Sequence, residues 1–145
     1  MEIIDRSVLV GYSAQQMYAL VEDIESYPQF LPWCDRAVAS VREPSRTVAT
    51  LHVNFHGLRQ QFTTENIKQQ GTRIDMKLVA GPFRNLEGYW AFTALDETAC
   101  KVEFRLCYQF AGRLLEKAVG PVFHRIADSF VDAFVRRAQV KFGAS

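Results

Sequence analysis

The sequence has few of the features that would reveal a compartment or a membrane. Only three of its 145 residues are cysteines, Cys34, Cys100 and Cys107, and this odd number without a CxxC pair argues against a disulfide framework. No apolar run approaches the roughly 18 residues of a membrane-spanning helix. The first residues, MEIIDRSVLV, lack the basic segment and apolar core of a signal peptide. We therefore expect a single cytoplasmic domain over residues 1–145.

The common catalytic and metal-binding motifs are also missing. The sequence has no GxSxG, GxGxxG, P-loop or HExxH segment. His52 and His56, placed in a strand, would lie roughly 13 Å apart, which is too far to hold one metal ion. The acidic segments 22–25 and 96–97 are expected in a helix and a turn, where carboxylates are usually hydrated. We therefore predict no catalytic residue, no metal site and no required cofactor.

Positive charge is scarce overall and gathers near the C-terminus. The net charge is +1. Residues 1–100 hold 9 Lys and Arg against 12 Asp and Glu, whereas residues 101–145 hold 8 against 4. A nearly neutral chain does not by itself indicate a nucleic-acid partner. The C-terminal segment is the basic part of the chain.

Hydrophobic periodicity predicts one short helix followed by strands. Residues 13–24, SAQQMYALVEDI, predict a helix that Ser13 and Gln16 begin with a capping box. Apolar and polar residues then alternate in segments 47–56, 58–68, 72–80, 84–95 and 100–110, which is typical of antiparallel strands with one solvated face. His56-Gly57 predicts a hairpin turn, and Gly81-Pro82 predicts a break between strands.

The spacing becomes helical from about Gly112 to Phe142. It predicts one helix on the order of 45 Å long, with Gly120-Pro121 as a kink or as its true start. The order of elements predicts an α+β domain. In this fold a curved antiparallel sheet of six or seven strands surrounds the long C-terminal helix, with short helices after the first strand.

The predicted inner faces are rich in aromatic residues. The residues expected to face the interior are Phe55, Phe62, Trp90, Phe92, Phe104, Tyr108, Phe123, Phe130 and Phe134, with gaps left at Ala80, Gly88 and Ala94. Gln60, Thr64 and Asn66 share the face of Phe62 and would need polar partners or water. Two interpretations stay open. One is a packed aromatic core with a hydrated edge, and the other is an apolar cavity with polar anchors for a lipid-like molecule.

Three segments together resemble a known family. They are YSAQQMYALVEDIESYPQFLPWC, LVAGPFRNLEGYWAF and VFHRIADSFVDAFVRRA, in this order along nearly the whole chain. They resemble the coenzyme Q-binding START-like proteins of the SRPBCC superfamily. The bacterial relatives of those proteins are described as oligoketide cyclases or as ribosome-association toxins of the RatA type.

The resemblance implies the helix-grip fold and favours the cavity interpretation. The implied function is non-enzymatic binding of ubiquinone, or of a similar isoprenoid quinone, in support of respiration. The cavity wall would consist of Phe55, Phe62, Trp90, Phe92, Phe104, Tyr108, Phe123 and Phe130. Gln60 and Thr64, or the Tyr108 hydroxyl, would then donate hydrogen bonds to the quinone ring, an assignment that rests on strand parity alone.

Residues 26–35, SYPQFLPWCD, receive an interpretation from the same resemblance. Two prolines exclude a long helix and disfavour a central strand, so the segment is expected to be a short, stiff, irregular turn. In a helix-grip domain the segment after the first helix closes one end of the interior. Tyr27, Phe30 and Trp33 would form either a rigid plug or an entrance lid. As a lid, Trp33 would also allow a peripheral contact with the inner membrane.

Ribosome binding is the alternative function that the resemblance implies. RatA-type relatives are described as binding the large ribosomal subunit and blocking subunit joining. Arg136, Arg137 and Lys141 are the cations available for such a contact, with Arg113 and Lys117 earlier. Basic residues in the last turn of a helix are also favoured by the helix dipole, which gives them a structural explanation. Polyketide cyclisation is a third alternative, for which the sequence offers no buried acid, base or nucleophile.

Overall fold

Seven antiparallel strands form one curved sheet in the computed structural model, which describes residues 1–55 and 57–143. The elements are β1 (Glu2–Val10), α1 (Ala14–Glu22), the 3-10 helix η1 (Ile24–Gln29), β2 (Cys34–Arg42), β3 (Arg46–Phe55), β4 (Leu58–Gln69), β5 (Arg73–Ala80), β6 (Phe83–Asp96), β7 (Ala99–Phe110), α2 (Arg113–Asp128) and α3 (Phe130–Phe142). His56 lies outside the described residues, and so does the side chain of Phe55.

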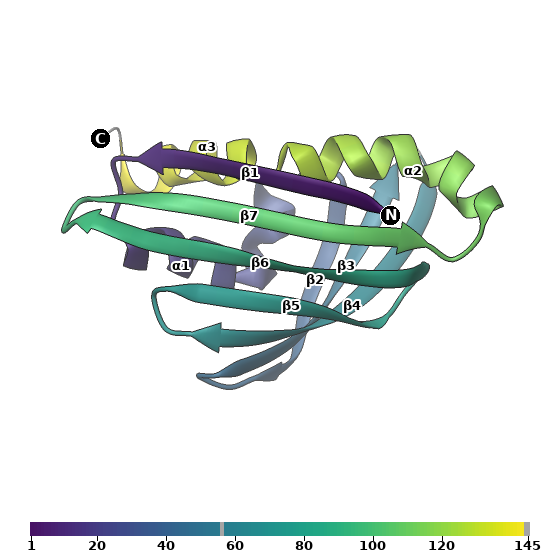
Figure 1. Ribbon diagram of the computed structural model, residues 1–145, viewed down its shortest axis with the longest axis horizontal. Coiled ribbons are helices and arrows are strands. Elements are labelled where there is room, and N and C mark those ends of the chain that lie inside the picture. The colour runs from purple at the N-terminus through teal and green to yellow at the C-terminus, as the bar shows by residue number, and fades with distance from the viewer. Residues whose placement is uncertain (56, 144–145) are drawn as a thin grey trace.

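The strand order is β1-β7-β6-β5-β4-β3-β2, so that only the pairing of β1 with β7 joins strands distant in sequence. That pairing runs from Glu2 opposite Tyr108 to Val10 opposite Cys100. Figure 1 shows β2, β3 and β4 curling away from β6 and β7, while α2 and α3 lie end to end beside β1. The prediction of six or seven antiparallel strands, with the short helices after the first of them, is confirmed.

The two faces of the sheet follow the predicted alternation. In β7 every second residue from Cys100 to Phe110 is buried, and the residues between them are partly exposed. Cys100 is fully buried whereas Cys107 is only partly so, which confirms that the two thiols lie on opposite faces. Burial raises the pKa of the Cys100 thiol. One face therefore packs against the helices, and the other faces solvent.

The start of α1 is the capping box that the sequence predicts. The Ser13 hydroxyl accepts a hydrogen bond from the Gln16 amide at 3.0 Å, and the Gln16 side chain accepts one from the Ser13 amide at 2.9 Å. Both bonds satisfy amides that the first helical turn leaves without partners. Met17, Leu20 and Val21 are buried, so the helical face that the spacing predicted packs on the sheet.

The C-terminal helix breaks at a different place from the one predicted. We expected Gly120-Pro121 to kink it or to start it, but α2 continues through Pro121 and ends at Asp128. Pro121 is exposed, so the carbonyl that loses its amide partner can be hydrated. The interruption lies at Ser129, whose hydroxyl donates to the Ile126 carbonyl at 2.8 Å and so competes with the regular helix bond.

The segment SYPQFLPWCD contains more regular structure than we expected. Residues 24–29 form the 3-10 helix η1 with Pro28 inside it, and Cys34 and Asp35 already belong to β2. A 3-10 helix this short leaves few amides that need an intrahelical partner, so one proline is tolerated. Only residues 30–33 form the irregular turn that the prolines predicted.

Gly88 is required by close packing of two strands and leaves no gap between aromatic rings. Gly88 of β6 lies opposite Leu106 of β7. A Cβ atom on it would overlap the Arg105 carbonyl oxygen and lie 3.1 Å from the Leu106 Cα atom. Ala80 and Ala94, the two other expected gaps, are exposed. None of the three residues therefore opens space inside the sheet.

We expect Gly88→Ala to lower the free energy of unfolding by about 2–3 kcal/mol, because backbone atoms of β7 must move to admit the methyl group. Gly120→Ala is the matched control, since its Cβ would approach nothing closer than 3.7 Å. The control should be neutral or stabilising by up to about 1 kcal/mol. Urea unfolding measures both, and equal effects of the two substitutions would contradict the close strand contact.

Candidate functional site

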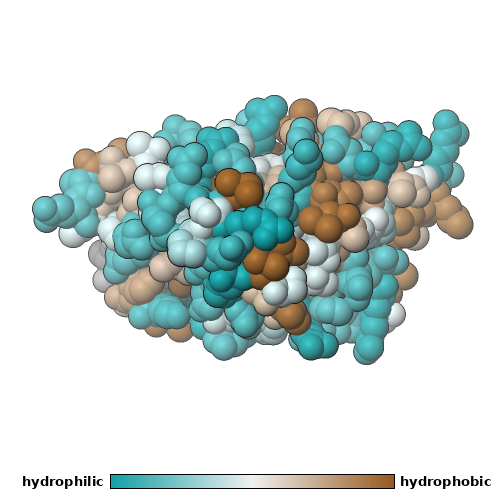
Figure 2. All heavy atoms as spheres, turned by 90° about the horizontal axis from the view of Figure 1, so that it is seen from below, coloured by the Kyte–Doolittle hydropathy of each residue, from teal (hydrophilic) through white to brown (hydrophobic). Residues whose placement is uncertain are grey.

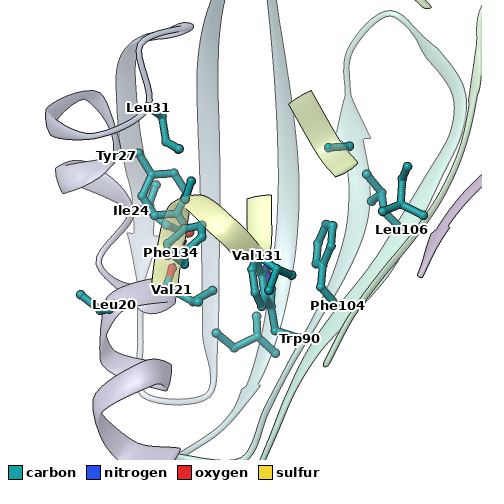
Figure 3. Packing of buried hydrophobic residues seen from close by; sticks show 14 of the residues in the cluster. Leu20, Val21, Ile24, Tyr27, Leu31, Trp90, Phe104, Leu106, Val131 and Phe134 are labelled. Atoms are coloured by element: carbon teal, nitrogen blue, oxygen red, sulfur yellow. Dashed lines mark hydrogen bonds between the residues drawn. The ribbon is translucent and has the colours of Figure 1, made fainter. Parts of the chain in front are cut away.

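The aromatic residues predicted to line a cavity contact one another. The Trp90 ring lies 4.6 Å from Phe104, measured between centroids, and Tyr108 lies 4.9 Å from Phe123. Trp90, Phe92, Phe104, Tyr108 and Phe123 are buried, and Phe62 and Phe130 pack against them half-buried. Figure 3 shows part of this interior, with Trp90 and Phe104 of the sheet close to α3. The seven rings that the structure describes belong to one cluster, and their role as a ligand-binding wall stays a prediction.

Phe83 belongs to the same cluster, although the strand pattern did not predict it. Its ring stacks on Phe110 at 4.8 Å and lies 5.1 Å from Phe123. We placed the start of this strand one residue later, after Gly81-Pro82. The register shifts between Phe83 and Asn85, so Phe83 and Leu86 are both buried although their parity differs. A bulge of this kind is not visible in the alternation of apolar and polar residues. The only available signal was that the residue after Pro82, Phe83, is apolar.

A groove lies beside the predicted wall, between the first residues of the chain and α2. Its volume is about 800 Å³. It is lined by Met1, Glu2, Tyr108, Gln109, Phe110, Arg113, Glu116, Lys117, Gly120, Pro121 and His124. Tyr108 therefore stands between the buried cluster and a surface groove of mixed polarity.

Tyr108 and His124 join the sheet to α2 in this groove. The Tyr108 hydroxyl lies 3.0 Å from His124 Nδ1, and Glu2 lies 4.0 Å from the same nitrogen. Burial, with a smaller effect of Glu2, raises the pKa of Tyr108 to about 12. The hydroxyl is therefore protonated at neutral pH and can donate to Nδ1 of a neutral imidazole.

The two predicted polar anchors, Gln60 and Thr64, do not share a site. Gln60 lines a second groove, of about 740 Å³, at the end of β2, β3 and β4. Thr64 is buried further along β4, and its hydroxyl donates to Asn66 Oδ1 at 2.8 Å. Gln60 and Thr64 do lie on the same face of β4, as predicted, but they are four positions apart along the strand. Their role as quinone anchors stays a prediction.

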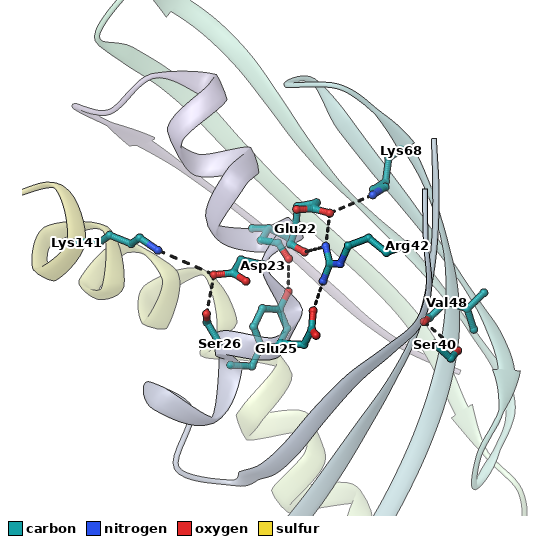
Figure 4. Close-up of polar contacts among 11 residues, drawn as sticks. Glu22, Asp23, Glu25, Ser26, Ser40, Arg42, Val48, Lys68 and Lys141 are labelled. Carbon is teal, nitrogen blue, oxygen red and sulfur yellow. Dashed lines mark hydrogen bonds and ion pairs between the residues drawn. The ribbon is translucent and has the colours of Figure 1, made fainter. Parts of the chain in front are cut away.

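In the acidic segment 22–25, where we expected hydrated carboxylates, Glu22 and Glu25 belong to an ion-pair network that includes the buried Lys68. Glu22 Oε1 accepts hydrogen bonds from Lys68 Nζ at 3.1 Å and from Arg42 Nη1 at 2.5 Å. Arg42 also pairs with Glu25. The Lys68 side chain is only 3% exposed, so Glu22 neutralises a charge held away from water. Figure 4 shows how this network ties α1 and η1 to the sheet.

Next to this network is a small polar cavity of about 20 Å³, large enough for one water-sized group. Thr47, Asn66 and Lys68 line its polar side, and Trp90 is among its apolar neighbours. The Thr47 hydroxyl is buried with no hydrogen-bond partner among the described residues. The strand pattern predicted Asn66 as an inward polar residue, and Lys68 has the same parity on β4. This parity was the available signal for the basic residue that we missed.

The predicted lid residues pack on α3. Tyr27 is buried, lies 5.3 Å from Phe134, and donates its hydroxyl to the Val21 carbonyl at 2.5 Å. The Phe30 ring lies 5.1 Å from Phe134. Trp33 stacks on Phe130 with centroids 5.3 Å apart and planes 14° apart. All three therefore pack on the first part of α3, and their role as a plug or a lid stays a prediction.

The three cations predicted for a ribosome contact have different environments. Arg137 donates to Gln29 Oε1 at 2.6 Å and lies over the Phe30 ring, so it helps to fix η1. Lys141 lies 4.0 Å from Asp23 in a weak ion pair. Arg136 is exposed and forms no ion pair with another described residue. Of the three, Arg136 is the one whose charge is free for a partner.

The part of the chain that the structure describes has neither a candidate metal cluster nor a helix that could span a membrane. Over residues 1–55 and 57–143, no group of three or more His, Cys, Asp and Glu residues could hold a metal ion. In the same ranges, no helix is long and apolar enough to span a membrane. The large exposed apolar side chains include Leu9, Val79 and Leu114, which lie on different elements. In Figure 2 the brown residues form small patches between teal ones.

Comparison with known proteins identifies the family. The model of the family described as polyketide cyclase / dehydrase and lipid transport matches residues 10–135. The chain belongs to this family. It is 43% identical over 143 residues to the ribosome association toxin RatA of Vibrio cholerae, covering 99% of each chain.

Two weaker similarities agree with the predicted resemblance. The mitochondrial coenzyme Q-binding protein COQ10 homolog B of Xenopus laevis is 26% identical over 145 residues, covering 94% of this chain and 58% of that protein. A START superfamily protein from Mycobacterium smegmatis superposes with a TM-score of 0.72 at 21% identity, covering 94% and 97% of the two chains. The resemblance drawn from the three motifs is confirmed, and so is the helix-grip fold.

Proposed function

We propose that this protein associates with the ribosome, binding the large subunit and blocking subunit joining. The observation that carries the proposal is the 43% identity to a protein named ribosome association toxin RatA, over 99% of both chains. The relative named for coenzyme Q binding is 26% identical and is matched over 58% of its length. The stronger similarity therefore supports the alternative that we ranked second from the sequence.

Ribosome association is tested by sedimentation of the purified protein with ribosomes at two salt concentrations. We expect co-sedimentation at low salt that weakens as salt rises, because contacts with phosphates release counterions. Arg136→Glu should weaken it further if α3 faces the ribosome. Protein that stays in the supernatant at low salt would overturn the proposal.

A hydrophobic ligand with a carbonyl head group is the second candidate function. The small cavity at Thr47 favours it, because that hydroxyl, the Asn66 amide and Lys68 Nζ are all hydrogen-bond donors. Glu22 and Glu25 already balance the charges of Lys68 and Arg42, so a neutral carbonyl fits better than a carboxylate. A ring would need η1 to move, because about 20 Å³ admits only one oxygen atom.

Organic extraction of the freshly purified protein, followed by mass spectrometry, tests this second candidate. A ubiquinone or another isoprenoid quinone at near-stoichiometric amount would support it, and Thr47→Val should then lower the amount recovered. Recovery of no quinone, together with no uptake of added ubiquinone, would contradict it. Peripheral membrane contact, cytoplasmic location and the cyclase alternative stay predictions that no described contact specifically favours.

A further inference from the structure

The groove at the end of β2, β3 and β4 is lined by two arginines and a histidine that we did not connect from the sequence. Its lining includes Arg36 of β2, His52 of β3 and Arg59 of β4, which are far apart in the sequence. Arg36 lies opposite His52, and His52 lies opposite Gln61. Arg59 is two residues from Gln61 on the same strand and therefore on the same face. The pairing of three strands thus gathers these side chains on the outer face of the sheet.

The spacing of these side chains follows from sheet geometry. Residues directly opposite each other on neighbouring strands have Cβ atoms about 5 Å apart, and diagonal neighbours lie about 7–8 Å apart. Arg36, His52 and Arg59 therefore form a row of nitrogen donors across three strands. Gln61 and Thr63 line the groove on the same outer face, whereas Gln60 lines it from the inner face.

The two arginines differ from most arginines of the sheet in having no ion-pair partner. Arg42, Arg46, Arg73 and Arg105 each pair with a carboxylate. Arg36 and Arg59 are exposed and form no ion pair with another described residue, although Asp35 also lines the groove. Guanidinium groups without carboxylate partners can bind phosphate oxygens through two parallel hydrogen bonds.

We propose that Arg36, His52 and Arg59 form a phosphate-binding surface through which the protein contacts ribosomal RNA. The inference rests on the proposed ribosome association, because that function is the reason for assigning RNA as the partner of this groove. The arginines hold backbone phosphates, which positions the protein without reading sequence. The Gln61 amide, which shares the outer face with Arg59, is placed to hydrogen-bond 2′-hydroxyls or base edges.

This surface is distinct from the C-terminal cations that the sequence suggested. Those residues lie on α2 and α3, which pack on the other face of the sheet. Part of that basic character is used within the molecule, at Arg137 and Lys141. Arg36 and Arg59 in the outer groove have no such partner among the residues that the structure describes. The outer groove is therefore a better phosphate site than the C-terminal cations.

The test compares two double variants that remove the same charge from exposed residues. Arg36→Gln/Arg59→Gln changes the proposed surface, and Lys117→Gln/Arg125→Gln changes α2, whose two cations are also exposed. Affinity for purified ribosomes is measured between low and high salt by sedimentation. We expect the first variant to bind roughly ten-fold more weakly at low salt, with a salt slope smaller by about 2 because two phosphate contacts are lost. The α2 variant should change affinity less than three-fold.

The outcomes separate this inference from the proposed function. If the unmodified protein does not bind ribosomes, the proposed function fails and takes the inference with it. If it binds and both double variants bind equally well, or the α2 variant is the weaker, the proposed surface is wrong while the function stands. Circular dichroism and urea unfolding of each variant establish that the fold is intact, as exposed residues should allow.

Discussion

Phe134→Ala will lower the free energy of unfolding by about 3–5 kcal/mol, the usual cost of removing a fully buried phenylalanine. The Phe134 side chain is 1% exposed, and its ring lies 5.1 Å from Trp90 and from Phe30 and 5.3 Å from Tyr27. It therefore joins α3 to the sheet and to η1 at one point. Truncation leaves a cavity that these rings cannot fill without moving. Urea unfolding monitored by circular dichroism measures the change.

Phe142→Ala is the matched control on the same helix. Phe142 is half-buried and contacts the Tyr12 ring at 6.0 Å, so its truncation should cost less than half as much. The comparison also decides between the two interpretations of the interior. If the interior is a packed core, Phe134→Ala will cost much more unfolding free energy than Phe142→Ala. An interior built to be filled by a ligand is loosely packed without it, and equal small costs for the two variants would contradict the packed core.

Glu22→Gln will destabilise the protein by about 3 kcal/mol, because it leaves the Lys68 ammonium buried without a counter-charge. Lys68 Nζ lies 3.1 Å from Glu22 Oε1, and the Lys68 side chain is 3% exposed. Gln keeps the shape of the side chain and one acceptor oxygen, so the loss is mainly electrostatic. Thermal and urea unfolding at pH 7 provide the measurement.

Glu25→Gln is the control for this prediction, since Glu25 also pairs with Arg42 but its side chain is 57% exposed. Its cost should be below about 1 kcal/mol. Glu22→Leu/Lys68→Met, which removes both charges, should recover most of the stability lost in Glu22→Gln. A double variant that is less stable than the single one would show that the pair itself, and not the unpaired lysine, carries the energy.

The parts of the fold that depend on local chemistry could be predicted from the sequence. Ser13 and Gln16 begin α1 with a capping box because this bonding is local. The burial of alternate residues from Cys100 to Phe110 follows from the period of two in a strand. Both features depend on neighbours a few positions away, so the residue pattern alone indicates them.

The features that were missed depend on distant partners or on local irregularity. From the sequence, Glu22 is expected to be a hydrated helix residue. In the folded chain, the sheet places Lys68, 46 positions later in the sequence, beside it. Arg36 and Arg59 lie near each other on one face only because β3 aligns β2 with β4. The helix break at Ser129 arises from a side-chain hydrogen bond, whereas Pro121 was the more conspicuous signal and was tolerated. Strand pairing and competing hydrogen bonds of this kind leave no trace in periodicity.

Binding of the purified protein to isolated large and small ribosomal subunits tests the proposed function most directly. Sedimentation at low salt should show saturable binding to the large subunit, weaker binding to the small one, and fewer joined ribosomes when both subunits are mixed with the protein. The binding should weaken as salt rises. Equal, non-saturable binding to both subunits, or no effect on subunit joining, would contradict ribosome association as the function of this chain.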